Sequence, residues 1–165
     1  MSTLRNILMG AAFAATAFNA AAALAAPAPM TNGQMIERGR YIAKIAGCND
    51  CHTPGYAQTG GKVPEKDWLI GDGLGWRGAW GTTYPSNLRL YMQNVSEVQW
   101  VKAAKTLQSR PPMPWFALHD MSELDLRAFH RFVRSLGPAG APAPAYVPPG
   151  QAPNGPYIQF PAAPQ

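Results

Sequence analysis

The chain has few charged residues and only two cysteines. Charged side chains make up 14% of its 165 residues, against roughly 25% in an average globular protein. So low a charge content excludes a coiled coil and a highly charged disordered protein. The formal net charge is +5, but the basic residues are dispersed. No Lys/Arg block and no basic run with interleaved aromatic residues is present, so the sequence predicts no nucleic-acid partner.

Proline, glycine and alanine are abundant instead, and they are unevenly placed. The chain has 17 Pro and 16 Gly, and 47% of its residues are hydrophobic. An Ala-rich start and a Pro-rich end raise these figures, so the remaining middle is where a hydrophobic core must form. The length predicts one domain with additional ends.

The first residues have the pattern of an export signal. Arg5 precedes an apolar, Ala-rich run over residues 7–25, and Ala23 and Ala25 fit an A-x-A cleavage site. We therefore expect residues 1–25 to be a signal peptide and the mature protein to be periplasmic, without an integral membrane anchor after cleavage. An uncleaved anchor is the alternative, but alanine gains little on membrane insertion and no stop-transfer charges follow the run.

Both cysteines belong to one short motif, Cys48-Asn49-Asp50-Cys51-His52. C-x-x-C-H is the attachment pattern of c-type haem. Two thiols one helical turn apart match the separation of the two vinyl groups on one porphyrin edge. The following imidazole then reaches the iron. The sequence therefore predicts one covalent haem c, bound through Cys48 and Cys51 and ligated by His52.

Other uses of the same motif are less favoured. A thioredoxin-like dithiol needs a preceding strand and a βαβ context, whereas a helical pattern precedes Cys48. A disulfide between Cys48 and Cys51 would close too short a loop to stabilise a fold much. Zinc would need a second pair of Cys or His ligands, which the sequence does not offer in a matching arrangement.

An electron-transfer haem needs a sixth ligand, usually Met or His. Met113 is the preferred candidate, because prolines on both sides make its segment extended and stiff. His130 lies in a helical pattern, His119 in an expected turn, and Met121 just before a helix start. Met92 could equally be a core residue. The five candidates are Met92, Met113, His119, Met121 and His130.

Apolar spacing predicts three helices around a loop-rich middle. The first covers about residues 33–46, with Asn32 as a plausible N-cap; the second starts at Ser96, and the last starts at Ser122 and ends at Gly137. We expect the first and last helices to cross at Gly39, opposite Phe129 or Val133. Residues 53–90 lack sustained periodicity and predict loops rather than strands.

The last residues, 138–165, form a Pro-rich tail, which favours extended polyproline conformation and excludes a central strand. Interspersed aromatic and aliphatic residues show that it is not a plain spacer. It either packs against the domain or docks a partner, and we favour the first.

Residues 34–137 resemble a monohaem c-type cytochrome of the bacterial periplasmic type, similar to the cytochrome subunits of alcohol and related dehydrogenases. The matching stretches are Arg38–Tyr41, Gly47–Thr53, Gly81–Leu88, Pro112–Trp115 and Met121–Ala128. The resemblance implies an all-α cytochrome c domain over 34–137, with three to four helices around the haem and residues 26–33 as an N-terminal extension.

The resemblance also implies a function and partners. It implies an electron carrier rather than an enzyme, with a dehydrogenase-type donor and a respiratory acceptor. The alternative is a haem subunit with a peroxidase-like role or with a purely structural or assembly role. In the peroxidase-like case His119 could be the acid–base residue only if Met113 were displaced. Four polar residues are candidates to bind the haem propionates: Arg77, Trp80, Tyr84 and Asn87.

Overall fold

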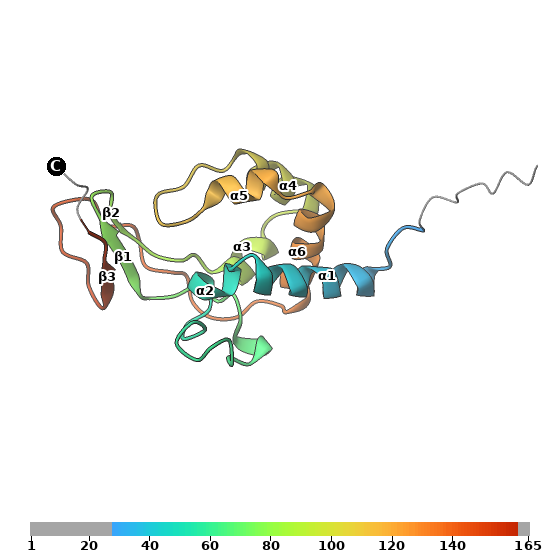
Figure 1. Cartoon of the computed structure of the whole chain (residues 1–165), viewed down its shortest axis with the longest axis horizontal. Coiled ribbons are helices and arrows are strands. Elements are labelled where there is room, and N and C mark those ends of the chain that lie inside the picture. Colours follow the sequence, from blue (N-terminus) through green and yellow to red (C-terminus); the bar gives the residue numbers. More distant parts are fainter. Residues whose placement is uncertain (1–27, 162–165) are drawn as a thin grey trace, which may run out of the picture.

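The computed structural model describes residues 28–161, and this part of the chain is mixed α/β (Figure 1). It contains six α-helices, a short 3-10 helix and a three-stranded sheet. The all-α prediction is therefore wrong. The elements in chain order are α1 (Asn32–Ile45), α2 (Cys48–His52), η1 (Glu65–Asp67), β1 (Gly75–Gly78), β2 (Gly81–Thr83), α3 (Leu88–Gln93), α4 (Glu97–Thr106), α5 (Trp115–Asp120), α6 (Glu123–Ser135) and β3 (Tyr157–Gln159).

Helices α1 and α6 pack closely against each other at Gly39. A Cβ at this glycine would collide with the Ala128 backbone and would lie 2.6 Å from Cβ of Phe132. The predicted crossing at Gly39 is thus confirmed, but the facing residues are Ala128 and Phe132 rather than Phe129 or Val133. Phe129 instead packs on Trp100 of α4, with ring centroids 5.8 Å apart.

The helix starts follow the capping pattern of the sequence. Ser96 and Gln99 form a capping box at α4, and the Ser122 hydroxyl accepts a hydrogen bond from the backbone N–H of Asp125 at α6. Helix α1 is capped by Thr31 and not by Asn32, which is already helical. The short helices α3 and α5 were not predicted, because six residues are too few for a clear period.

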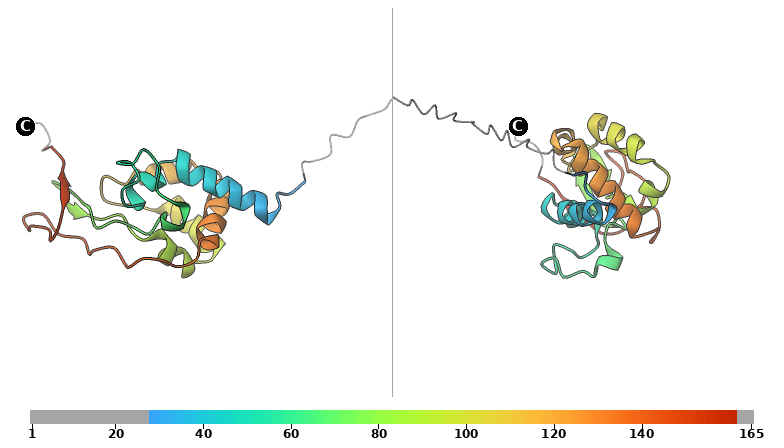
Figure 2. Two further views of the ribbon diagram at one scale, coloured as in Figure 1. Left: turned by 90° about the horizontal axis from the view of Figure 1, so that it is seen from below. Right: turned by 90° about the vertical axis from the view of Figure 1, so that its right-hand side faces the viewer.

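The sheet corrects the prediction that residues 53–90 are all loop. β1 and β2 form an antiparallel hairpin, and β3 pairs in parallel with β1, so that the order is β2-β1-β3. The strands were hard to predict because they have only three or four residues each, β1 begins and ends with glycine, and β3 comes from the Pro-rich tail. Figure 1 and the left view of Figure 2 place the sheet at the end of the molecule away from α6.

The described part of the tail packs against the domain, as predicted. It runs from α6 back to the sheet (Figure 1). The Asn87 side-chain amide donates to the carbonyls of Ala139 and Ala141, and Val147 pairs with Thr82. β3 lies at the sheet edge, where proline-rich sequence is tolerated.

Arg89 joins three segments of the fold from a buried position. It is 5% exposed, and its guanidinium donates to the carbonyls of Lys66, Leu136 and Gly137. These carbonyls lie in η1 and just beyond the end of α6, so one side chain connects the loop-rich middle to the last helix. A planar fork of donors suits such a set of acceptors.

The predicted signal peptide, residues 1–25, lies outside the described residues. Within residues 28–161, no helix is long and apolar enough to span a bilayer.

Candidate functional site

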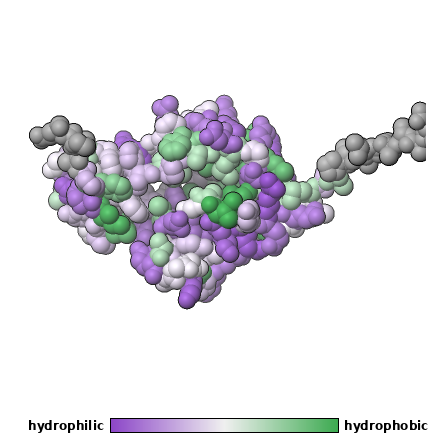
Figure 3. Space-filling view, viewed as in Figure 1, coloured by the Kyte–Doolittle hydropathy of each residue, from purple (hydrophilic) through white to green (hydrophobic). Residues whose placement is uncertain are grey.

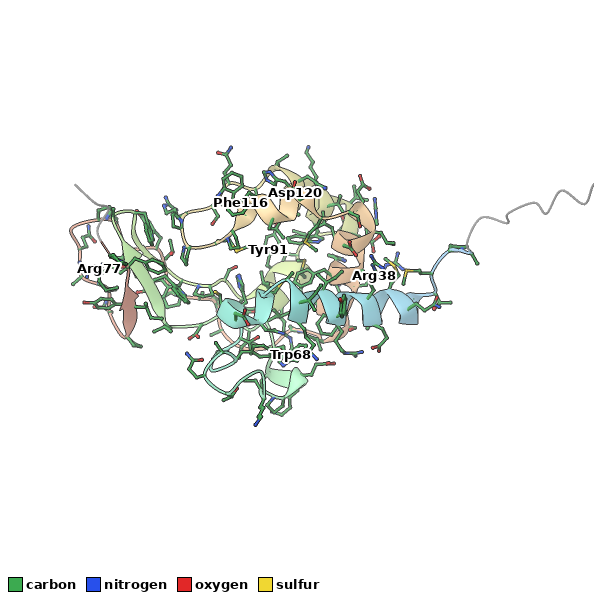
Figure 4. All side chains as sticks on the ribbon, in the orientation of Figure 1. Arg38, Trp68, Arg77, Tyr91, Phe116 and Asp120 are labelled. Carbon is green, nitrogen blue, oxygen red and sulfur yellow. The ribbon has the colours of Figure 1, made fainter. Side chains whose placement is uncertain are left out.

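A cavity of about 330 Å³ is lined by residues of α2 to α6, of β1 and β2, and of the loop before α5. This volume lies within the range of small-molecule and cofactor sites, roughly 300–1,000 Å³. Figure 3 shows hydrophobic side chains gathered beside a hollow on this face, and Figure 4 shows Tyr91 between the upper and lower halves of the ribbon, where it lines the cavity. The described lining is mostly apolar or aromatic, with Arg110 as its charged side chain; it includes Leu88, Trp100, Ala104, Leu107, Leu118 and Phe129.

Helix α2 brings the whole Cys-x-x-Cys-His motif to this cavity. Cys48, Cys51 and His52 all line it. The turn into α2 uses Gly47 in the left-handed region at φ 69°, a conformation that favours glycine. The far end is fixed because the buried Thr53 hydroxyl donates to Asn49 Oδ1 at 2.8 Å and accepts the Leu69 N–H at 2.8 Å. The motif therefore stands on a rigid single turn.

The two cysteines are free thiols, and both have raised pKa values. Burial raises the pKa of Cys48 to about 12, and burial together with the nearby Asp50 and Asp72 carboxylates raises the pKa of Cys51. A redox-active dithiol needs a lowered thiol pKa, because the thiolate is the nucleophile. This environment disfavours a thioredoxin-like role. It suits sulfur atoms that are consumed in thioether bonds and no longer titrate.

His52 is held in one orientation by the backbone. It is 8% exposed, and burial lowers its pKa, which keeps the imidazole neutral at neutral pH. Its Nδ1 lies 2.7 Å from the Ser86 carbonyl oxygen. Because a carbonyl can only accept, Nδ1 carries the proton and Nε2 keeps a free lone pair. This is the arrangement that second-shell groups impose on a metal-binding histidine.

Met113 lines the same cavity and is half-buried. It lies in the loop between α4 and α5, where the Thr83 hydroxyl donates to the Pro111 carbonyl at 2.8 Å. The other four ligand candidates are absent from the described lining of the cavity: Met92, His119, Met121 and His130.

Each of these four candidates packs or hydrogen-bonds outside the cavity. Met92 is completely buried in the core. His119 lies in α5 rather than in a turn, and its Nε2 lies 2.9 Å from the Leu107 carbonyl. His130 Nε2 lies 2.9 Å from the Val95 carbonyl, and Met121 packs against the core beside the α6 cap. The two histidines each have a ring nitrogen engaged with backbone.

Three of the four residues predicted to bind propionates are placed elsewhere. Arg77 lies at the sheet end of the molecule (Figure 4), with its guanidinium over the Tyr157 ring. Trp80 does not line the cavity. The Asn87 side chain is used by the tail and by the cap of α3. Only Tyr84 lines the cavity.

Trp76 is a cavity residue that the sequence analysis did not predict. It lines the cavity from β1, and its buried indole N–H has no partner among the described residues. An unpaired buried donor costs about 1–3 kcal/mol, so a bound acceptor would stabilise this site. Its neighbour Arg77 instead lies over the Tyr157 ring.

Taken together, the cavity residues fit a c-type haem. Two thiols one turn apart, a neutral imidazole with a free Nε2 and a thioether all line one apolar cavity. The same cavity is lined by Trp76, whose indole N–H is unpaired among the described residues. No protein-family model, curated protein or solved structure matches the chain. The ligand of this cavity is therefore inferred from its own residues.

Proposed function

We propose that this protein is a periplasmic electron carrier with one covalent haem c, not an enzyme. The observation that carries the proposal is the joint lining of one cavity by Cys48, Cys51, His52 and Met113. In this proposal the two cysteines hold the cofactor by thioether bonds, and His52 and Met113 are the two iron ligands. When bound, the haem supplies an iron that accepts and releases one electron while both ligands stay in place.

Each residue has a distinct task in this proposal. The Ser86 carbonyl keeps the proton of His52 on Nδ1, so that the lone pair of Nε2 would be free to bind the iron. The neutral sulfur of Met113 favours the softer ferrous state, which raises the reduction potential. The apolar wall of the cavity would also raise the reduction potential, because it excludes water and burial penalises net charge.

The proposed partners are redox proteins. A dehydrogenase-type donor would deliver single electrons and a respiratory acceptor would remove them, as the sequence resemblance suggests. A peroxidase-like role would need an acid–base residue at the open face of the haem. His119 lies outside the described lining of the cavity and is bonded to the Leu107 carbonyl, which favours the carrier.

Covalent attachment is tested first, on the protein purified from the periplasm. Acid acetone should leave the haem with the protein, because thioether bonds survive this extraction. The Cys48→Ala/Cys51→Ala variant should lose the haem, whereas the matched control His130→Ala, which removes a histidine outside the cavity, should keep it. The proposal is refuted if acid acetone removes the haem from the parent protein. It is also refuted if the double variant keeps all of its haem.

Electron transfer is tested with the same preparation. Proteins captured from periplasmic extract with the intact chain should include a dehydrogenase that reduces the haem when its own substrate is added. A captured partner that binds the chain equally well but never reduces the haem would favour the structural alternative.

A further inference from the structure

The Pro-rich tail contacts the loop that carries Met113. Arg110, three residues before Met113, lines the cavity and places its guanidinium 3.8 Å from the centroid of the Tyr146 ring. Among residues 28–161, Arg110 forms no ion pair, so the aromatic ring is its cation partner. A guanidinium stacked this closely on an aromatic face is held by a cation–π interaction.

Tyr146 is itself fixed to the sheet. Its hydroxyl donates to the Trp80 carbonyl at 2.7 Å, and the adjacent Val147 exchanges two backbone hydrogen bonds with Thr82, at 2.8 and 3.0 Å. Gly81 permits this approach: its φ is 97°, and a Cβ there would lie 3.0 Å from the Tyr146 ring. The Tyr146 ring therefore packs beside the start of β2 and contacts Arg110 of the loop.

The loop has little backbone structure of its own. Residues 107–114 contain no regular helix or strand. Side chains of other segments hold it instead: Thr83 of β2 bonds the Pro111 carbonyl at 2.8 Å, and His119 contacts the Leu107 carbonyl. Tyr146 adds a cation–π contact from the tail.

From these contacts we propose that residues 138–161 form a strap that holds the Met113 loop in the cavity wall, with Tyr146 as the positioning residue. The strap acts on the loop through Arg110 and not on the cofactor. Only the statement that the held side chain is an iron ligand rests on the proposed function. Loss of the Tyr146 contact should loosen the loop, make the Met113 position labile and admit external ligands.

The test uses the full-length haem protein and the Tyr146→Leu variant. Two quantities are measured: the rate of carbon monoxide binding to the reduced protein, and amide hydrogen exchange of a peptide covering residues 107–120. Both should rise about tenfold, since a cation–π contact and a hydrogen bond are lost together. Tyr146→Phe keeps the ring over Arg110, so both rates should stay close to those of the parent protein. Rates within twofold of the parent for Tyr146→Leu would overturn the proposal.

Two further variants separate the strap from general effects. Arg110→Leu removes the same contact from the loop side and should reproduce the increase even if Tyr146→Leu folds poorly. Tyr157→Leu removes another tail tyrosine, whose ring packs on Arg77, and should leave both rates unchanged. Equal effects of Tyr157→Leu and Tyr146→Leu would show general loosening of the tail and refute a specific strap.

Failure of the ligand assignment gives a different result. If Met113→Ala leaves carbon monoxide binding unchanged, Met113 is not the sixth ligand and the proposed function loses that residue. Hydrogen exchange of the loop still decides the strap in that case, because it measures the loop directly. If Met113→Ala opens the site but neither Tyr146→Leu nor Arg110→Leu changes either rate, only the strap is refuted.

Discussion

Gly39 of α1 lies so close to α6 that a Cβ at this position would come within 2.6 Å of Cβ of Phe132. The Ala128 carbonyl blocks the same space and belongs to a rigid helix backbone. Gly39→Ala should therefore push the two helices apart and lower the free energy of unfolding by about 1–3 kcal/mol. Urea denaturation measures this change.

Gly33 provides the matched control in the same helix. Nothing lies within 4 Å of a Cβ at this position, so Gly33→Ala should be neutral or should stabilise the protein by up to about 1 kcal/mol through helix propensity. Equal denaturation midpoints for the two variants would show that α1 and α6 do not meet at Gly39 in solution.

Met113→Ala should open the sixth coordination position of the proposed haem. The long-wavelength thioether–ferric absorption band should disappear, carbon monoxide should bind readily, and the reduction potential should fall because the soft sulfur donor is lost. Absorption spectra and potentiometry measure these changes.

Met92→Ala is the methionine control for this experiment. Met92 is completely buried but is absent from the described cavity lining, so its loss should cost about 2–5 kcal/mol of stability and leave the band unchanged. His119→Ala should also retain the band. If carbon monoxide binding stays blocked in Met113→Ala but becomes possible in His119→Ala, the sixth ligand is a second histidine and not a thioether.

Arg89→Lys should destabilise the fold although charge is conserved. A lysine ammonium cannot match the planar fork that bonds the carbonyls of Lys66, Leu136 and Gly137. Buried carbonyls left without donors should lower the free energy of unfolding by about 2–4 kcal/mol. Thermal and urea unfolding of the variant provide the measurement.

Arg134→Lys tests whether any arginine-to-lysine exchange has this effect. Arg134 is exposed and donates to the carbonyls of Met92 and Gln93, where water can replace it. Arg134→Lys should lower the free energy of unfolding by less than about 0.5 kcal/mol. A cost as large as that of Arg89→Lys would argue against a special role for the buried guanidinium.

Glu97 should make stability depend on pH in the acid range. Hydrogen bonds from Arg131, opposed by partial burial and supported by Arg127, lower its pKa below the ordinary value of 4.5. A lowered folded-state pKa contributes stability above pH 4.5 that is lost as pH falls through the folded value. Glu97→Gln should cost about 0.5–1 kcal/mol at pH 7, and this cost should shrink as pH falls below 4.5 toward pH 3.

Glu123→Gln is the control for this pH effect. Glu123 meets Arg127 at 3.3 Å, but its side chain is 65% exposed, so solvent screens the pair. Its effect should stay below about 0.5 kcal/mol at both pH values. A Glu97→Gln effect that is the same at pH 7 and pH 3 would show that charge is not its cause.

Local chemistry made part of this structure predictable. Ser96 with Gln99 and Ser122 with Asp125 carry their capping pattern within four residues, and the corresponding helices begin where expected. The prolines around Met113 identified a stiff segment, and that segment lines the cavity. The Cys48–His52 motif is likewise local. Its prediction required no knowledge of distant contacts.

Long-range pairing accounts for what was missed. β1 is stabilised by partners that follow it at Gly81 and at Tyr157. Its two glycines disfavour a strand, and its length of four residues is too short for a clear pattern. Trp76 was overlooked for this reason. The facing residues at Gly39 were one position off, because helical spacing does not reveal that Phe129 packs on Trp100 and Phe132 on Trp68.

The parallel pairing of β3 with β1 has a consequence for how the chain folds. It joins Gly75 to Tyr157, 82 positions apart (157 − 75), and the α1–α6 crossing joins Gly39 to Ala128, 89 positions apart (128 − 39). Contacts of such separation close large loops and slow folding. A growing chain exposes its first helix for most of its synthesis and completes its sheet only after nearly every residue has emerged.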